Sequence, residues 1–105
     1  MKIDLEITYN QLLFLNDFMG TNLPLEFATS DKRVKSLLYL TTEVAQKLLK
    51  KTIDKMGIKK PFKLSLKYYE AYALHQFILT FMYYEPSESK RVTREILGIL
   101  NQKLT

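Results

Sequence analysis

FKLSLKYYEAYAL, residues 62–74, joins a strand pattern directly to a helix pattern. Apolar and polar side chains alternate from Phe62 to Leu66, and a period of two is typical of a half-buried strand. After Lys67 the alternation stops, and a long apolar and aromatic run predicts a helix over residues 68–84. The segment therefore predicts a strand that passes into a helix without an intervening loop.

A second stretch, IDLEITYNQLLFL at residues 3–15, has the same organisation. At an offset of 59 residues, four positions are identical: Leu5 and Leu64, Tyr9 and Tyr68, Leu15 and Leu74, Phe18 and Phe77. At an offset of 58, Lys32-Arg33-Val34 matches Lys90-Arg91-Val92. We interpret the chain as an internal pseudo-repeat of residues 1–57 and 61–105. Convergence of two similar patterns is the alternative.

Turn residues and caps set the remaining boundaries. Thr8 followed by Gln11 has the form of a capping box at a helix start. Gly20 and Gly57 occupy positions where a left-handed residue would end a helix, and a connector is expected from Asn22 to Ser30. The predicted elements are strands at 3–7 and 62–66 and helices at 9–19, 31–56, 68–84 and 88–103.

We predict a single domain over residues 1–105 with an α+β fold that is mostly helical. Two β-α-α halves related by a pseudo-two-fold would place their strands side by side and antiparallel, by the logic of a symmetric dimer. The result is a short two-stranded ribbon packed on four helices. In this arrangement the outward residues Asp4 and Glu6 would face Lys63 and Lys67, a favourable cross-strand combination.

Composition narrows the class of protein. The chain has no cysteine, which excludes disulfides and thiolate metal sites. Its first residues, MKIDLEIT, lack the apolar run of a signal peptide, and no stretch approaches the roughly 20 apolar residues of a membrane span. We therefore expect a small, cytoplasmic protein that does not bind a membrane.

Residues suited to catalysis are scarce. His75 is the only histidine, and no nucleophile elbow, phosphate-binding loop or dinucleotide motif occurs. We expect His75 to be partly buried and hydrogen-bonded to backbone or tyrosine, and Gly98 to mark a close crossing of helices. No metal, no cofactor and no enzymatic activity are predicted. An enzyme with a site assembled only by the fold is the third of three functional hypotheses.

The helix predicted at 68–84 is apolar on both sides. Such a helix is either central within the monomer or offers one face to a partner. Tyrosine suits a partner surface because its ring is apolar and its hydroxyl tolerates water. The first hypothesis is therefore a non-catalytic protein-interaction module, a homodimer or larger homo-oligomer. The candidate interface residues are Tyr69, Tyr72, Phe77, Phe81 and Tyr84.

Basic charge is concentrated in one region. The formal net charge is +5, and residues 47–67 contain eight lysines but only one acid, Asp54. The second hypothesis is a nucleic-acid-binding accessory protein that uses this segment, whereas an ordinary solvated surface is the alternative. Basic residues at the starts of the second and fourth helices are further anion candidates. The candidate contacts are Lys47, Lys51, Lys55, Lys59, Lys60, Lys63, Lys67, Lys32, Arg33, Lys90 and Arg91.

Overall fold

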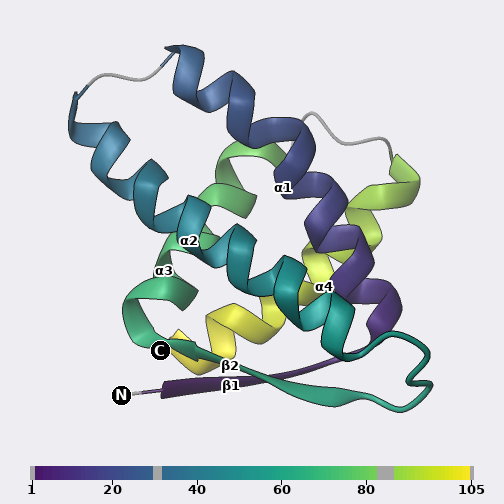
Figure 1. Cartoon of the computed structure of the whole chain (residues 1–105). Helices are drawn as coiled ribbons and strands as arrows, with labels where there is room; N and C mark the ends of the chain where they lie inside the picture. Colours follow the sequence, from purple (N-terminus) through teal and green to yellow (C-terminus); the bar gives the residue numbers. More distant parts are fainter. Residues whose placement is uncertain (1, 30–31, 83–86, 105) are drawn as a thin grey trace.

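A computed structural model of the chain describes residues 2–29, 32–82 and 87–104, and for residues 24–29, 32–38 and 87–89 it describes the backbone only (Figure 1). The fold is α+β and mostly helical, with one antiparallel pair of strands, as predicted. The elements are β1 (Lys2–Ile7), α1 (Tyr9–Thr29), α2 (Lys32–Asp54), β2 (Phe62–Lys67), α3 (Tyr68–Phe81) and α4 (Ser87–Leu104).

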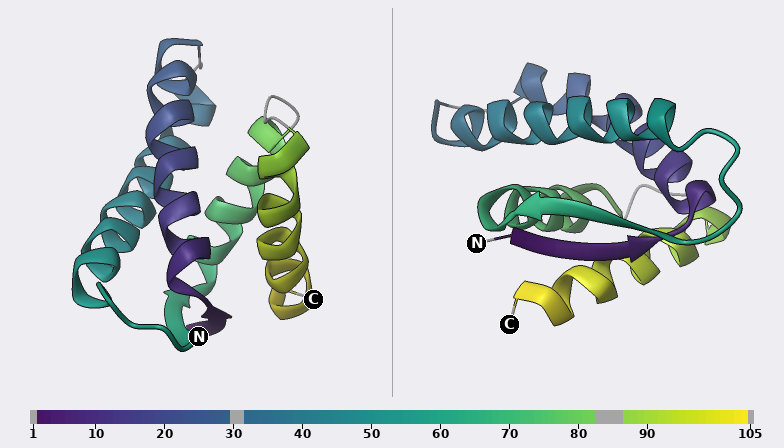
Figure 2. Two further views of the ribbon diagram at one scale, coloured as in Figure 1. Left: turned by 90° about the vertical axis from the view of Figure 1, so that its right-hand side faces the viewer. Right: turned by 60° about the horizontal axis from the view of Figure 1, so that its bottom comes forward.

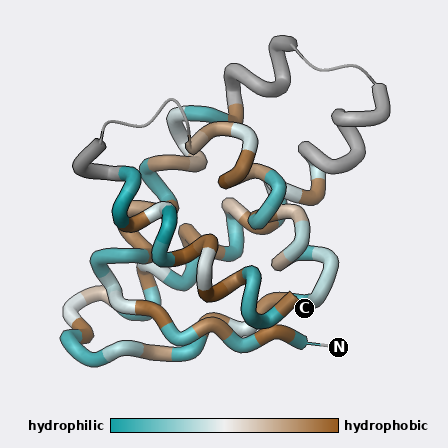
Figure 3. Tube along the Cα trace, turned by 180° about the vertical axis from the view of Figure 1, so that it is seen from behind, coloured by the Kyte–Doolittle hydropathy of each residue, from teal (hydrophilic) through white to brown (hydrophobic). Residues whose placement is uncertain are grey.

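The ribbon has one buried face and one exposed face. β1 and β2 pair from Lys2 opposite Lys67 to Ile7 opposite Phe62. Apolar side chains of both strands are buried toward the helices, whereas their polar neighbours point outward. Figure 3 shows the alternation of hydrophobic and hydrophilic residues along the strands. All four helices lie on the buried side of the ribbon (Figure 1). The predicted ribbon is confirmed.

The register of the ribbon is symmetric about one pair of residues. Leu5 lies directly opposite Leu64, its counterpart at the offset of 59. Exchanging the two halves therefore exchanges the Ile3–Leu66 pair with the pair formed by Phe62 and Ile7, and both pairs are present. A local pseudo-two-fold axis follows from this register, while the origin of the two halves by duplication stays a prediction.

Matching caps join each strand to its helix. Thr8 N–H donates to Gln11 Oε1 at 2.9 Å, and Gln11 N–H donates to Thr8 Oγ1 at 3.2 Å, which confirms the predicted capping box. In the second half, Lys67 N–H donates to Glu70 Oε1 at 2.8 Å. Gln11 and Glu70 are counterparts at the same offset, so the strand-to-helix junction is built alike in both halves.

The helices form two hairpins, α1 with α2 and α3 with α4, and α2 also packs on α3. Figure 2 shows that β2 lies on the side of α2 and β1 on the side of α4. The hydrophobic core lies between the helices and the ribbon. The fully buried large side chains of the core are Leu5, Ile7, Leu12, Leu15, Met19, Leu48, Leu64, Leu66, Leu74, Ile78 and Ile96.

Among the described residues, none of the helices combines the length and the hydropathy of a membrane span.

The predicted end of the first helix at Gly20 is wrong. α1 continues through Gly20 and Pro24 to Thr29, across the expected connector. Core packing explains the continuation, because Met19 and Asn22 are buried on the same side as the preceding apolar residues. The Asn22 side chain also donates to the Phe18 carbonyl at 2.9 Å. Tertiary contacts here outweigh the weak helix propensity of glycine.

The predicted boundary at Gly57 is confirmed, since its φ of 84° lies in the left-handed region. The apolar residues at the end of the helix predicted at 31–56 lie outside the core, because Ile53 is 66% exposed and Met56, in the turn after α2, is 70% exposed. The buried row of α2 passes through Leu48 and Thr52, whose hydroxyl is hydrogen-bonded to Asn16 of α1. Ile53 is turned about 100° from that row.

Cross-strand charge pairing follows the prediction at one position only. Glu6 lies opposite Lys63, as expected. Asp4 instead lies opposite Ser65, whose hydroxyl donates to its carboxylate at 2.6 Å. Lys67 lies opposite another cation, Lys2. The expectation that both acids face a lysine is therefore wrong at Asp4, because a register centred on Leu5 sets position 4 against position 65.

Candidate interaction surfaces

The outward face of α3 is aromatic and accessible. Tyr68, Tyr72 and Leu79 recur at spacings of four and seven residues and are 41%, 49% and 37% exposed. Tyr69, at the edge of this face, is 47% exposed. The opposite side of α3 is buried, through Glu70, Ala71, Ala73, Leu74, Phe77 and Ile78. The helix is thus buried on one side and open on the other. We call Tyr68, Tyr69, Tyr72 and Leu79 the α3 face.

None of the four side chains of the α3 face is itself ionic, but the ammonium of Lys67 lies 5.6 Å from the centre of the Tyr69 ring at its edge. Glu70 is the only acidic residue in α3, which contains no lysine or arginine, and it lies on the buried side. His75 is partly buried, as predicted, but its partners are side chains rather than backbone or tyrosine. Its Nε2 lies 2.6 Å from Asn101 Oδ1 and its Nδ1 lies 3.3 Å from Gln76 Nε2.

Four of the five predicted interface residues lie in the described part of the chain, and they occupy three different environments. Tyr69 and Tyr72 are exposed, whereas Phe77 is only 3% exposed, so its assignment to an interface is wrong. The ring of Phe77 packs edge-on against Phe18 at 5.7 Å and lies 5.0 Å from the ring of Phe81, which is partly buried against the core. Tyr84 lies outside the described residues. The spacing of aromatic residues in the sequence therefore predicted the exposed side of α3 only in part.

Lysines converge at the free edge of β2. A pocket of about 330 Å³ lies between α2 and the ribbon. Two of its lysines, Lys47 and Lys51, are one turn apart on α2, and the others are Lys67 and Lys2, from the paired ends of the strands. Leu64, Ser65 and Leu66 complete the described lining. We call this the lysine pocket. The candidate residues Lys47, Lys51 and Lys67 meet here, and Lys2 was missed because only the register reveals its position.

Glu70 lies beside the lysine pocket and is already engaged. Its Oε1 accepts hydrogen bonds from Lys47 Nζ at 3.1 Å and from the Lys67 N–H at 2.8 Å. Burial acts to raise the pKa of the carboxyl, but these two donors outweigh it, so the pKa of Glu70 is lowered. The carboxylate is therefore ionised at neutral pH, and Lys47 is its ionic partner.

The other lysines of the basic segment lie apart from the pocket. The ammonium of Lys55 lies 5.6 Å from the centre of the Phe62 ring. Lys59 and Lys60 are exposed in the turn before β2, and Lys63 is exposed opposite Glu6. The predicted basic segment is thus divided between a concave cluster and a dispersed, solvated group.

The basic start of α4 forms a second, more open depression of about 570 Å³. Its described lining consists of Lys90, Arg91, Arg94 and Glu95. Arg91 approaches Glu95 at 3.9 Å, so a carboxylate partly neutralises the cluster. The side chains of the repeat counterparts, Lys32 and Arg33, lie outside the described residues.

An apolar surface on α2 was missed by sequence reasoning. Leu49, Ile53 and Met56 recur at spacings of four and three and are 57%, 66% and 70% exposed. A groove of about 270 Å³ between α1 and α2 adjoins Leu49 and Leu23. The sequence alone does not separate this surface from the core, because exposed Leu49 directly follows buried Leu48 and exposed Ile53 directly follows buried Thr52. We call Leu49, Ile53 and Met56 the α2 patch.

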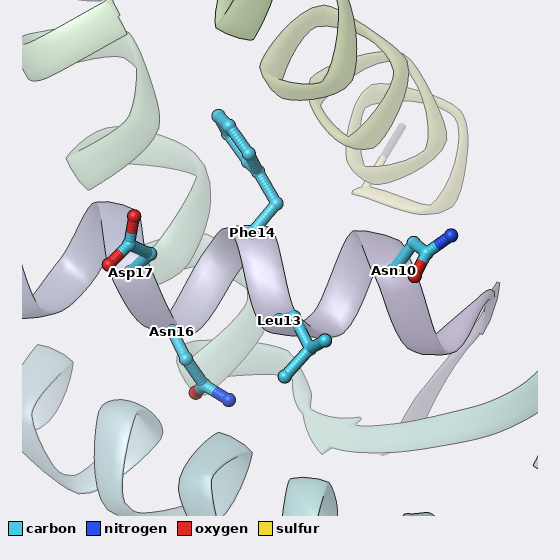
Figure 4. Close-up of a pocket in the computed structure, with 5 residues that line it drawn as sticks. All are labelled: Asn10, Leu13, Phe14, Asn16 and Asp17. Atoms are coloured by element: carbon cyan, nitrogen blue, oxygen red, sulfur yellow. The ribbon is translucent and has the colours of Figure 1, made fainter. Parts of the chain in front are cut away.

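A further depression, of about 550 Å³, lies along α1 and is lined by Asn10, Leu13, Phe14, Asn16 and Asp17. All five side chains come from one helix, and Figure 4 shows Leu13 and Asn16 pointing to the opposite side from Phe14 and Asp17. Side chains that diverge in this way do not surround a ligand.

Side chains that could bind a metal ion are dispersed in the part of the chain that the structure describes. No three of its histidine, aspartate and glutamate side chains are grouped so as to hold a metal ion. A Cβ at Gly98 would meet nothing within 4 Å, so the predicted close helix crossing is wrong.

Neither a protein-family model, a curated protein nor a solved structure matches the chain.

Proposed function

We propose that this protein is a non-catalytic interaction module in which two copies associate through the α3 face. The observation that carries the proposal is an exposed aromatic surface made of uncharged side chains, centred on Tyr72. Tyrosine is enriched at protein interfaces, whereas charged residues are depleted from interface centres. The only histidine, His75, is engaged by Asn101 and Gln76, which favours a structural role over a catalytic one.

Charge favours the α3 face over the α2 patch as the contact between copies. Each copy has a formal net charge of +5, so surfaces rich in lysine repel one another. The α2 patch is interspersed along the chain with Lys50, Lys51 and Lys55, whereas α3 contains no basic residue apart from His75. Of these two surfaces, the α3 face is therefore the one where two copies repel each other less.

Light scattering on the purified protein tests this proposal. We expect the wild type to have twice the monomer mass of 12.4 kDa, and Tyr72→Glu to have the monomer mass. Burying a carboxylate in an apolar contact without a partner costs several kcal/mol, which is enough to separate the copies. Phe81 is unsuitable as a target, because its ring packs against Phe77 and its loss would disturb the fold.

Two control variants place the same charge on other exposed apolar residues. Tyr39→Glu changes a tyrosine of α2 that is 65% exposed, and Leu49→Glu changes the α2 patch. Both should retain the wild-type mass. A monomeric wild type at every concentration contradicts the proposal. So does dissociation of Leu49→Glu when Tyr72→Glu remains associated.

A further inference from the structure

We propose that the lysine pocket binds a phosphate group. This site lies on α2 and the ribbon and is separate from the proposed self-association through α3. Four lysines line it, Lys2, Lys47, Lys51 and Lys67, and no carboxylate is among its described lining residues. Two of their ammonium groups have neighbours of their own, because Lys47 contacts Glu70 and Lys67 lies over the Tyr69 ring. Lysine is a common phosphate ligand that acts as a point charge, and several lysines together suit an anion with three acceptor oxygens.

The ribbon itself places two cations face to face. Lys67 N–H donates to Glu70 and not to β1, so Lys2 and Lys67 form a pair without ladder hydrogen bonds. In such pairs the strands approach closely, at about 4.5 Å between Cα atoms. Like charges directly opposite one another destabilise a strand pair. Glu70, which contacts Lys47, and the Tyr69 ring, which lies 5.6 Å from the Lys67 ammonium, offset part of this repulsion, and a bound anion would offset more of it.

A backbone donor adds to the lysines. Ladder pairs alternate between the two hydrogen-bonding types, so Asp4 and Ser65 also form a pair without ladder hydrogen bonds. The Ser65 N–H therefore points away from β1, toward the free edge of β2, and Ser65 lines the pocket. A phosphate oxygen at this edge would accept from Ser65 N–H while Lys51, Lys67 and Lys2 neutralise its charge.

Calorimetric titration with inorganic phosphate, in chloride buffer of constant ionic strength, tests the site. We expect one phosphate per chain in the wild type. Lys51→Gln should raise the Kd about tenfold or more, because it removes a charge-assisted contact. Lys59→Gln removes the same charge from the exposed turn and should change the Kd less than about twofold. Lys47 is not a suitable target, because it also holds Glu70.

A short thymidine oligonucleotide distinguishes the two sources of the phosphate. Binding that is tighter than that of inorganic phosphate, and that is lost in Lys51→Gln, identifies a nucleic-acid backbone as the source. Equal or weaker binding identifies a small phosphorylated molecule. Both outcomes require that inorganic phosphate binds.

Three results would overturn the proposed phosphate site: no heat of binding with inorganic phosphate, oligonucleotide binding without phosphate binding, or an equal increase of the phosphate Kd in Lys51→Gln and Lys59→Gln. Each would indicate only diffuse attraction by a basic surface. Tyr72→Glu should leave the phosphate Kd unchanged, so this proposal and the self-association fail independently. Circular dichroism melts of each variant establish that the fold is retained.

Discussion

Glu70 on α3 accepts a hydrogen bond from Lys47 on α2 at 3.1 Å and so joins the two halves of the molecule. The carboxylate is 9% exposed and also caps α3 through the Lys67 N–H. Glu70→Gln removes the charge but keeps the shape. We expect it to lower the free energy of unfolding by about 1 kcal/mol at pH 7, since Lys47 remains partly solvated.

The effect of Glu70→Gln should depend on pH in a defined direction. Because the pKa of Glu70 is lowered in the folded protein, its stabilising contribution is complete above the ordinary value of 4.5. The contribution is lost as the pH falls through the lowered folded-state pKa. Denaturation curves should therefore converge for wild type and variant in acid. A difference that stays constant with pH, or an equal effect in the exposed control Glu43→Gln, would contradict this role.

The three glycines should respond differently to alanine. Gly98 and Gly20 lie inside helices with open space where a Cβ would stand, so Gly98→Ala and Gly20→Ala should each raise the free energy of unfolding by about 0.5–1 kcal/mol. Gly57 has a φ of 84°, so Gly57→Ala should lower it by about 1 kcal/mol. Urea denaturation measures all three, and destabilisation by Gly98→Ala would reveal a contact at that position.

Side-chain truncation should separate the true core from the α2 patch. Leu64 is 1% exposed at the centre of the ribbon, so Leu64→Ala should cost about 2–5 kcal/mol. Met56 is 70% exposed, and Met56→Ala should change the free energy of unfolding by less than about 0.5 kcal/mol. Equal losses would mean that the end of α2 is covered within the monomer.

The element types could be predicted from the sequence because local patterns and tertiary packing agree in most of the chain. The alternation around Leu5 and Leu64 defined both strands, and Thr8 with Gln11 marked a helix start. Gly20 and Gly57 show the limit of such reasoning. The same residue type ends one helix and lies within another, because only Gly20 is followed by side chains that continue the core face.

The candidate surfaces were less predictable, because they depend on helix rotation and strand register. Aromatic composition identified α3, but it does not show which aromatic side chains face the solvent, and Tyr72 and Phe77 point about 140° apart around the helix. The lysine cluster was visible as charge density, yet Lys2 joins it only because the register sets it against Lys67. Residues distant in sequence become neighbours through packing, which no local pattern reports.

The most direct test of self-association through α3 is a dilution series of ¹H–¹⁵N correlation spectra on the unmodified protein. Amide resonances around Tyr68, Tyr72 and Leu79 should shift or broaden with concentration, because the copies exchange between free and associated forms at this face. Resonances around Leu49 and Ile53 should stay constant. Concentration-dependent shifts confined to the α2 patch, or spectra that do not change while the mass remains that of a monomer, would contradict the account.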